Sequence, residues 1–247
     1  MMSKQRSKRT SGLMTALAVC GLLAVGAPAA YAVPALQLDI ADGVYDPLTQ
    51  TIVTSSDTFT LYALLDPTAN RISTTETYYL SVALSPATAT AADLGQFTFN
   101  GQTIDATADM TYGVPPIELG GLATHDGGDL ASHGVFPTYF SEFAFNFNLS
   151  NTSGVYNTQD DPGGIQAGSG LLYVAFEVDR SLLSSPYQLH FDLYSERFRN
   201  GDTDVNRFAP FSHDAGTTTR SVPEPASLLL LGAGLAGIGI WRRMKIS

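Results

Sequence analysis

The chain has 247 residues, a sequence pI of about 4.6 and a formal net charge of −10. Residues 33–222 contain six arginines, no lysine and 22 acidic residues, which gives this central part a net charge of −16. Such a composition argues against nucleic acid or anionic lipid as a partner, because both bind to cationic surfaces.

The N-terminus has the three parts of a Sec signal peptide. A basic segment at residues 4–9 precedes an apolar run, Leu13–Ala27, and Ala30 and Ala32 form the small-x-small pattern of a cleavage site. We therefore expect export through the Sec translocon and cleavage by signal peptidase after Ala32.

The only cysteine, Cys20, lies within this signal peptide. A lipoprotein anchor at Cys20 is disfavoured, because the bulky Val19 directly precedes it. Cleavage leaves no cysteine and hence no disulfide framework, so core packing has to stabilise the domain, with a metal ion as a further possible contributor. Roughly 190 residues suffice for one sizeable core.

The middle of the chain has the pattern of β-strands, with alternating apolar and polar residues or runs of aromatic and β-branched residues. No part of it has a convincing helical period. The Asn100-Gly101 dipeptide between two short strands predicts a hairpin with a type I′ turn. The predicted strands are Ala35–Ile40, Thr58–Leu65, Thr77–Leu84, Phe97–Phe99, Thr103–Ile104, Glu142–Leu149, Leu171–Val178 and Tyr187–Tyr194.

About eight to ten strands separated by Gly, Pro, Asn and Asp predict an all-β fold, a single β-sandwich over residues 33–220, with a jelly roll as one variant. Two long polar stretches, Thr111–Tyr139 and Gly154–Gly170, interrupt the strands. Loops of this length are usually functional or disordered.

Two groups of residues suggest a metal. Asp202, Asp204 and Asn206 form a D-x-D-x-N run like that of calcium loops, but Arg207 and His213 replace the Gly and Glu of a complete EF loop. A looser calcium site completed by another loop and a solvated acidic loop both remain open, and the solvated loop is the favoured interpretation.

The second group combines imidazoles and carboxylates, a plausible transition-metal shell with no recognised zinc spacing. A loop-capping role for these histidines is the more common alternative. The group comprises His125, Asp126, Asp129 and His133, with His213-Asp214 further along the chain.

No Gly-x-Ser-x-Gly elbow occurs, and with 22 acidic residues a glycosidase-like carboxylate pair carries no information. We therefore expect no enzymatic activity, with a polysaccharide hydrolase as the minor alternative. Tyr112, Tyr139 and Tyr156 could stack on sugar rings, although packing against the sandwich ends is the favoured interpretation.

The C-terminus combines a rigid Pro223-Glu224-Pro225 after Val222, a short apolar segment to Ile240, and a stop formed by Trp241, Arg242, Arg243 and Lys245. A helix of about 15 residues would span about 22 Å, less than the hydrocarbon core of about 30 Å. The segment is thus a marginal membrane anchor.

This order resembles the PEP-CTERM sorting signal of exopolysaccharide-producing Gram-negative bacteria. The resemblance implies transient inner-membrane anchoring, processing by exosortase near Pro223-Glu224-Pro225, and a final location at the cell surface or in the extracellular matrix. The expected domains are therefore a signal peptide (1–32), a secreted β-sandwich (33–220) and a sorting signal (221–247).

The middle domain is similar to the choice-of-anchor N family, a group without an assigned activity. The residues that carry this similarity include Leu36–Ile40, Phe59–Leu64, Phe136–Phe140 and Phe208–Asp214. Three hypotheses follow: a non-enzymatic protein of the surface, biofilm or exopolysaccharide, a calcium- or carbohydrate-binding module, and a secreted polysaccharide hydrolase.

Overall fold

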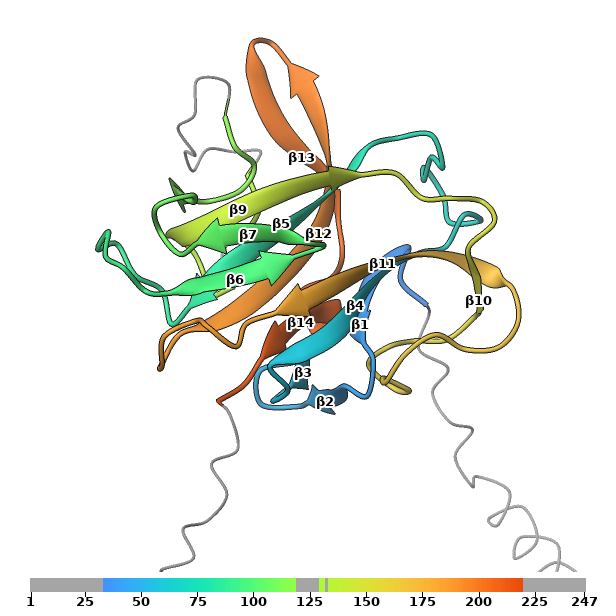
Figure 1. Cartoon of the computed structure of the whole chain (residues 1–247). Coiled ribbons are helices and arrows are strands. Elements are labelled where there is room, and N and C mark those ends of the chain that lie inside the picture. Colours follow the sequence, from blue (N-terminus) through green and yellow to red (C-terminus); the bar gives the residue numbers. More distant parts are fainter. Residues whose placement is uncertain (1–32, 119–128, 132, 220–247) are drawn as a thin grey trace, which may run out of the picture. The chain divides into compact units, whose positions relative to one another are not determined.

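The computed structural model describes residues 33–118, 129–131 and 133–219. These residues belong to the second of two compact units, Val33–Ser247, and the first unit, Met1–Ala32, contains none of them. The described part contains β-strands, one short 3₁₀ turn (η1, Phe211–His213) and no α-helix, so the all-β prediction is confirmed (Figure 1).

The strands form two sheets that pack as a sandwich. The six-stranded sheet has the order β1-β4-β11-β6-β7, with β10 added beside β11. Its neighbouring strands are antiparallel throughout. Its strands are β1 (Leu36–Ile40), β4 (Thr58–Leu65), β6 (Gln96–Phe99), β7 (Gln102–Asp105), β10 (Thr152–Gly154) and β11 (Gly170–Asp179).

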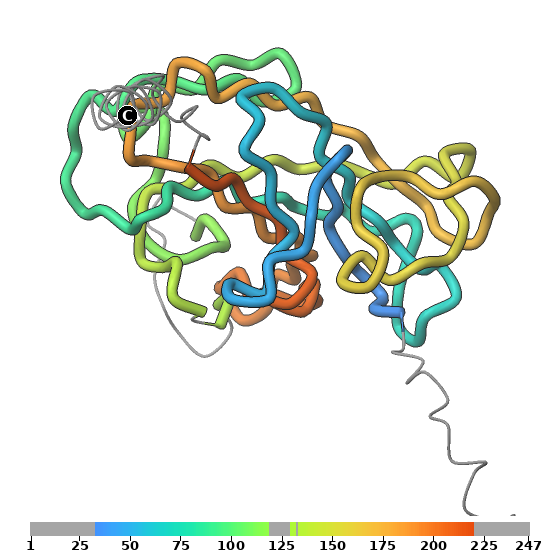
Figure 2. The backbone as a smooth tube through the Cα atoms, turned by 90° about the horizontal axis from the view of Figure 1, so that it is seen from below, coloured from blue at the N-terminus to red at the C-terminus, as the bar shows by residue number. Residues whose placement is uncertain are grey.

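The eight-stranded sheet has the order β2-β3-β14-β12-β5-β9-β8, with β13 paired to β12. The last strand, β14, lies between β3 and β12, parallel to the first and antiparallel to the second. Early and late parts of the chain therefore lie side by side (Figure 2). The strands are β2 (Val44–Asp46), β3 (Thr51–Thr54), β5 (Tyr78–Ser85), β8 (Thr111–Gly113), β9 (Thr138–Phe145), β12 (Gln188–Arg199), β13 (Asp202–Phe208) and β14 (Asp214–Thr217).

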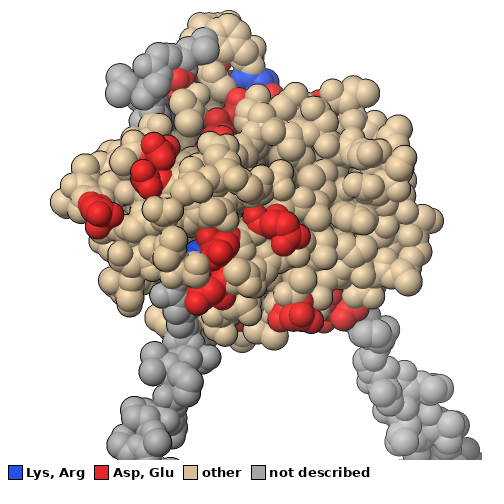
Figure 3. Space-filling model, viewed as in Figure 1, with Lys and Arg blue, Asp and Glu red and all other residues tan. Residues whose placement is uncertain are grey.

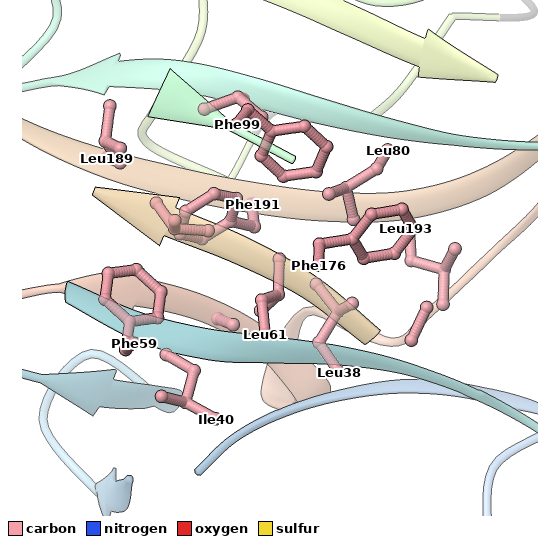
Figure 4. Packing of buried hydrophobic residues seen from close by; sticks show 14 of the residues in the cluster. Leu38, Ile40, Phe59, Leu61, Leu80, Phe99, Phe176, Leu189, Phe191 and Leu193 are labelled. Atoms are coloured by element: carbon pink, nitrogen blue, oxygen red, sulfur yellow. The ribbon is translucent and has the colours of Figure 1, made fainter. Parts of the chain in front are cut away.

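The main core lies between the two sheets. Leu38 and Leu61 of the six-stranded sheet and Leu193 of β12 are fully buried (Figure 4). Phe59 meets Phe191 of the other sheet edge to face, with ring centroids 6.1 Å apart. Burying one such side chain is worth about 1.5–3 kcal/mol, so this layer supplies the apolar stabilisation that a cysteine-free domain needs.

The alternating segments were predicted most accurately. The interval Thr58–Leu65 is strand β4, and β1, β5 and β11 match their predictions to within about a residue at each end. Asn100 and Gly101 have φ of 49° and 81°, as a type I′ turn requires.

Other boundaries were wrong. Strand β9 runs Thr138–Phe145 instead of Glu142–Leu149, and β12 continues to Arg199. The first polar stretch contains β8, and β10 ends where the second stretch begins. The described residues hold more strands than predicted, because several have only three or four residues and too little alternation to be recognised.

One buried carboxylate, Asp39 of β1, organises the polar stretch after β10. Its Oδ1 accepts a hydrogen bond from Gly163 N (3.0 Å), and its Oδ2 accepts bonds from Gly164 N and from the Tyr156 hydroxyl (both 2.9 Å). Gly163 and Gly164 have φ of 118° and 125°, which L side chains rarely adopt. Burial raises the pKa of Asp39 although these donors favour its charged form.

A buried arginine fixes the end of the described C-terminal segment. Arg180, 2% exposed, donates from Nε to Ser56 O (3.0 Å), from Nη1 to Thr218 O (2.9 Å) and from Nη2 to Ser55 O (2.9 Å). The segment that leaves β14 is thus held against the turn before β4.

Acidic side chains are distributed over the face shown in Figure 3, which presents only small basic areas. The predicted signal peptide with Ala30 and Ala32, the PEP tripeptide and the Trp241–Lys245 stop lie outside the described residues. Within residues 33–118, 129–131 and 133–219, we find no helix with the length and hydropathy needed to span a bilayer.

Candidate metal centre

Strand β12 divides its side chains between the core and the opposite face of its sheet. Leu189, Phe191 and Leu193 belong to the main core. Because successive strand residues point to opposite faces, His190 and Asp192 point away from that core together. Both are nevertheless buried, 9% and 2% exposed.

Strand β14 adds a second carboxylate beside them. Ala215 of β14 lies in the main core and is paired with Phe191, whereas Asp214, one residue earlier, points to the same face as His190 and Asp192. Asp214 is 1% exposed. The parallel partner β3, where Thr51 is paired with Asp214, holds this strand in register.

A second hydrophobic cluster covers this face of the sheet, and His133 packs against two of its aromatic rings. The ring of His133 stacks on Phe211, with centroids 4.2 Å apart and an interplanar angle of 16°, and meets Phe136 edge-on at 5.8 Å. The aromatic contacts orient the imidazole toward the sheet. The cluster consists of Ala83, Val114, Leu130, Phe136 and Phe140, with Ile117, Val135, Val205 and Phe211 packed against it.

The four side chains converge on one point. His133 Nε2 lies 3.1 Å from His190 Nε2 and 3.0 Å from Asp192 Oδ1, and His190 Nε2 lies 3.4 Å from that same oxygen. Asp214 Oδ2 is 3.8 Å from each Nε2. All four atoms lie within 4.8 Å of one another, the one such group among the described His, Cys, Asp and Glu side chains.

Contacts from outside the group orient its members. His133 Nδ1 lies 3.1 Å from the carbonyl oxygen of Ala131, which can only accept, so Nδ1 carries the proton and Nε2 presents its lone pair. Ser81 Oγ donates to Asp192 Oδ2 at 2.9 Å and leaves Oδ1 directed at the centre. Outer contacts of this kind are typical of metal ligands.

The inner oxygen atoms lack hydrogen-bond donors. Asp192 Oδ1 and Asp214 Oδ2 are buried and accept no hydrogen bond of acceptable geometry from the described residues. Buried carboxylate oxygens without a donor are costly, so each such atom needs an explanation. A cation held between them would provide one.

The electrostatics of the group are strongly coupled. Burial raises the pKa of Asp192, but the charge of His190 and the contact with His133 outweigh it and hold that pKa far below its ordinary value. Burial and the charge of Asp192 raise the pKa of Asp214 well above its ordinary value. Burial lowers the pKa of His133, but the contact with Asp192, the charge of Asp192 and the Ala131 carbonyl together raise it by more.

The arrangement therefore offers two imidazole nitrogens and two carboxylate oxygens to a cation. Of the four side chains, only the two imidazoles line an adjacent cavity of about 440 Å³, which also contacts Thr51 and Phe211. This cavity supplies an entry path for an ion.

Of the second predicted metal group, the structure brings His133 and Asp214 together. Asp129 interacts instead with Glu118, and His125 and Asp126 lie outside the described residues. His213 lies next to Asp214 in the chain but contacts Asn157 Oδ1 at 2.9 Å and Ser212 Oγ at 2.9 Å.

The D-x-D-x-N run forms part of strand β13 and not a loop. Asp204 Oδ2 accepts from Arg197 Nε at 3.3 Å, and Asn206 donates to Glu76 Oε1 at 2.9 Å. Asp202 Oδ1 accepts from the Thr203 amide. The three side chains thus have separate partners, two on the β12–β13 hairpin and one, Glu76, directly before β5.

Sequence reasoning missed His190 and Asp192, because the interval Tyr187–Tyr194 was assigned to a strand on its apolar residues. The signal was present as His190-Phe191-Asp192, two ligand-type side chains at strand spacing around a core residue.

The three tyrosines predicted as candidates for sugar stacking do not lie together. Tyr156 is buried and donates its hydroxyl to Asp39, whereas Tyr112 is 42% exposed and packs against Tyr139, with ring centroids 5.4 Å apart.

Fold and centre together define a β-sandwich domain with a buried His₂Asp₂ cluster. Residues 221–243, directly beyond the described part, match the model of the PEP-CTERM protein-sorting motif. The chain therefore carries the sorting signal of an exported protein that is anchored transiently in the membrane and processed by exosortase. No curated protein and no solved structure matches the chain.

Proposed function

We propose that this protein is a non-enzymatic component of the cell surface or exopolysaccharide matrix of a Gram-negative bacterium, delivered there by exosortase. The sorting motif at residues 221–243, only a few residues after the last strand at Thr217, is the observation that carries this proposal. It makes the whole described domain the cargo that sorting delivers.

The absence of catalysis is proposed on chemical grounds. A catalytic metal keeps at least one position for water or substrate, whereas His133, His190, Asp192 and Asp214 offer four donors, as many as a closed tetrahedral site takes. The carboxylates of Asp192 and Asp214 are buried beneath the second hydrophobic cluster, so a substrate cannot reach them.

The termini of the native protein test the sorting proposal. Mass spectrometry on cells and medium should find a form that begins at Val33 and ends near Pro223. Glu224→Ala should leave the unprocessed form in the membrane fraction, whereas the exposed Glu177→Ala should be processed normally. Persistence of an intact Trp241–Ser247 tail in native cells would refute processing.

Residence in the matrix and the lack of activity need separate assays. The processed protein should remain with the host exopolysaccharide during cell washing and should release no reducing ends from it. Free diffusion into the medium would contradict the first part, and reducing ends would contradict the second.

A carbohydrate-binding role is the second candidate, and one observation favours it. The exposed ring of Tyr112 lies against Tyr139 on neighbouring strands β8 and β9, a pair that offers an aromatic face to a sugar. Tyr112→Ala should then abolish retention on the host polysaccharide, while Tyr187→Ala, directly before β12, should preserve it.

A further inference from the structure

We propose that His133 Nε2, His190 Nε2, Asp192 Oδ1 and Asp214 Oδ2 bind one zinc ion in a closed, four-coordinate site that fastens the last strand of the domain. The inference concerns the folded domain and does not depend on where sorting places it.

The distances fit this ion. Zinc–nitrogen and zinc–oxygen bonds of about 2.1 Å require tetrahedral ligand atoms to lie about 3.4 Å apart. The five separations between the ligand atoms given above, from 3.0 to 3.8 Å, bracket that value. The sixth pair, Asp192 Oδ1 and Asp214 Oδ2, lies within 4.8 Å, so small side-chain adjustments would bring all four donors to bonding distance of a central ion.

The charges fit as well. In their metal-binding forms, two neutral imidazoles and two carboxylates carry a charge of −2, so a divalent ion makes the buried group neutral. The same ion would bind Asp192 Oδ1 and Asp214 Oδ2, the buried oxygens that accept no hydrogen bond. It also separates lone pairs that otherwise face one another at 3.0–3.8 Å.

The donor set discriminates among metals. Calcium takes six to eight oxygen ligands and magnesium demands an octahedron, whereas this site provides four donors, two of them nitrogen. Imidazole suits zinc, copper, iron and nickel, but copper(II) and nickel(II) favour square-planar or tetragonal arrangements. Non-haem iron(II) is typically held by two histidines and one carboxylate with open positions, so a closed tetrahedral set of four protein donors assigns the site to zinc.

The ligands join segments that are far apart in the sequence. His133 precedes β9, His190 and Asp192 belong to β12, and Asp214 begins β14. Strand β14 is only four residues long and shares just two residue pairs with β12. Because a bound metal contributes its binding free energy to folding, zinc would strengthen the attachment of the strand that leads to the sorting motif.

The full chain, produced in a host without exosortase and purified in detergent, tests this proposal. After incubation with zinc and desalting, elemental analysis should find one zinc per chain, and EDTA should lower the melting temperature. Asp214→Asn should reduce zinc affinity more than about 100-fold, and Ser81→Ala, which removes an outer contact, about 10- to 100-fold.

A sign reversal separates a ligand from a merely structural carboxylate. In EDTA, Asp214→Asn should melt at or above the wild-type temperature, because it removes a carboxyl group buried beside Asp192. In zinc, it should melt below wild type. Equal destabilisation in both conditions would overturn the proposal.

His213→Gln provides the matched control, since His213 is buried, adjacent to Asp214 and outside the group. It should retain one zinc per chain, and zinc loss in this variant would contradict the assignment of ligands. Cobalt(II) should give the intense visible bands of four-coordination. Weak six-coordinate bands, or absence of zinc binding by the wild type, would refute the site.

Discussion

Gly216 of β14 lies opposite His190 of β12, and a side chain at this position would stand beside the imidazole on the same face of the sheet. A Cβ at Gly216 would lie 3.8 Å from His190 Nδ1 and 3.3 Å from the carbonyl oxygen of Leu189. A side chain larger than alanine at this position would therefore share its face of the sheet with the imidazole of one proposed ligand.

We expect Gly216→Val to displace the His190 ring, weaken zinc binding at least tenfold and cost about 1–3 kcal/mol of folding free energy, as overpacking does. Titration with zinc and thermal unfolding measure the two effects. Gly216→Ala, which only touches its neighbours, should have the smaller effect in both assays. Equal effects of both variants would show that the size of the side chain at position 216 does not displace the His190 ring.

A second prediction concerns the carboxyl pair Glu142 and Glu196 on the same sheet. Burial, followed by the charge of Glu142, raises the pKa of Glu196 from its ordinary 4.5 to about 8, and Tyr194 donates its hydroxyl to Glu142. The folded state thus binds a proton that the unfolded chain releases between these values. Stability from this group is complete below pH 4.5 and is lost as the pH rises through 8.

Glu196→Gln should remove this loss, about 1–2 kcal/mol after allowance for the partial exposure of the side chain. Chemical denaturation at a series of pH values between 4.5 and 8.5 measures the slope. The exposed Glu177→Gln should keep the wild-type slope. An unchanged slope in Glu196→Gln would show that another group titrates.

The third prediction tests the anchor at Asp39. Asp39→Ala leaves the amides of Gly163 and Gly164 and the Tyr156 hydroxyl without their acceptor, and we expect a loss of about 3 kcal/mol or more. Hydrogen exchange at residues 156–166 should accelerate before the rest of the domain unfolds.

Asp46→Ala is the matched control for Asp39. Asp46 accepts comparable hydrogen bonds from Leu48 and Thr49, but at an exposed turn. It should cost at most about 1 kcal/mol and leave exchange at residues 156–166 unchanged. A similar cost for both variants would contradict the special role of the buried carboxylate.

The fourth prediction concerns Arg180, which donates to carbonyls of the turn before β4 and of the segment after β14. Arg180→Met removes these donors and should cost about 2–4 kcal/mol, with faster proteolysis at residues 217–220. Arg180→Lys should recover only part of the loss, because one ammonium cannot reproduce the planar fork. Full recovery of the stability by Arg180→Lys would show that only the positive charge of Arg180 matters.

Sequence patterns predicted the strands that alternate around the main core, because a two-residue period reports burial on one face. They did not predict β14 or β3, since four residues such as Asp214–Thr217 carry no recognisable period. The centre was found only in part for the same reason. His133 was noticed beside glycine and aspartate, whereas His190 and Asp192 were hidden within an apolar strand, and only the pairing of β12 with β14 brings Asp214 to them.

The position of β14 has a consequence for the order of events during secretion. The strand is inserted between β3, which ends at Thr54, and β12, and it is the last to be synthesised. As the chain emerges N-terminus first, β3 and β12 present unpaired backbone edges until residues 214–217 have crossed the membrane. Open edges of this kind invite pairing with other chains, so the nascent domain is most prone to aggregation or chaperone capture just before translocation ends.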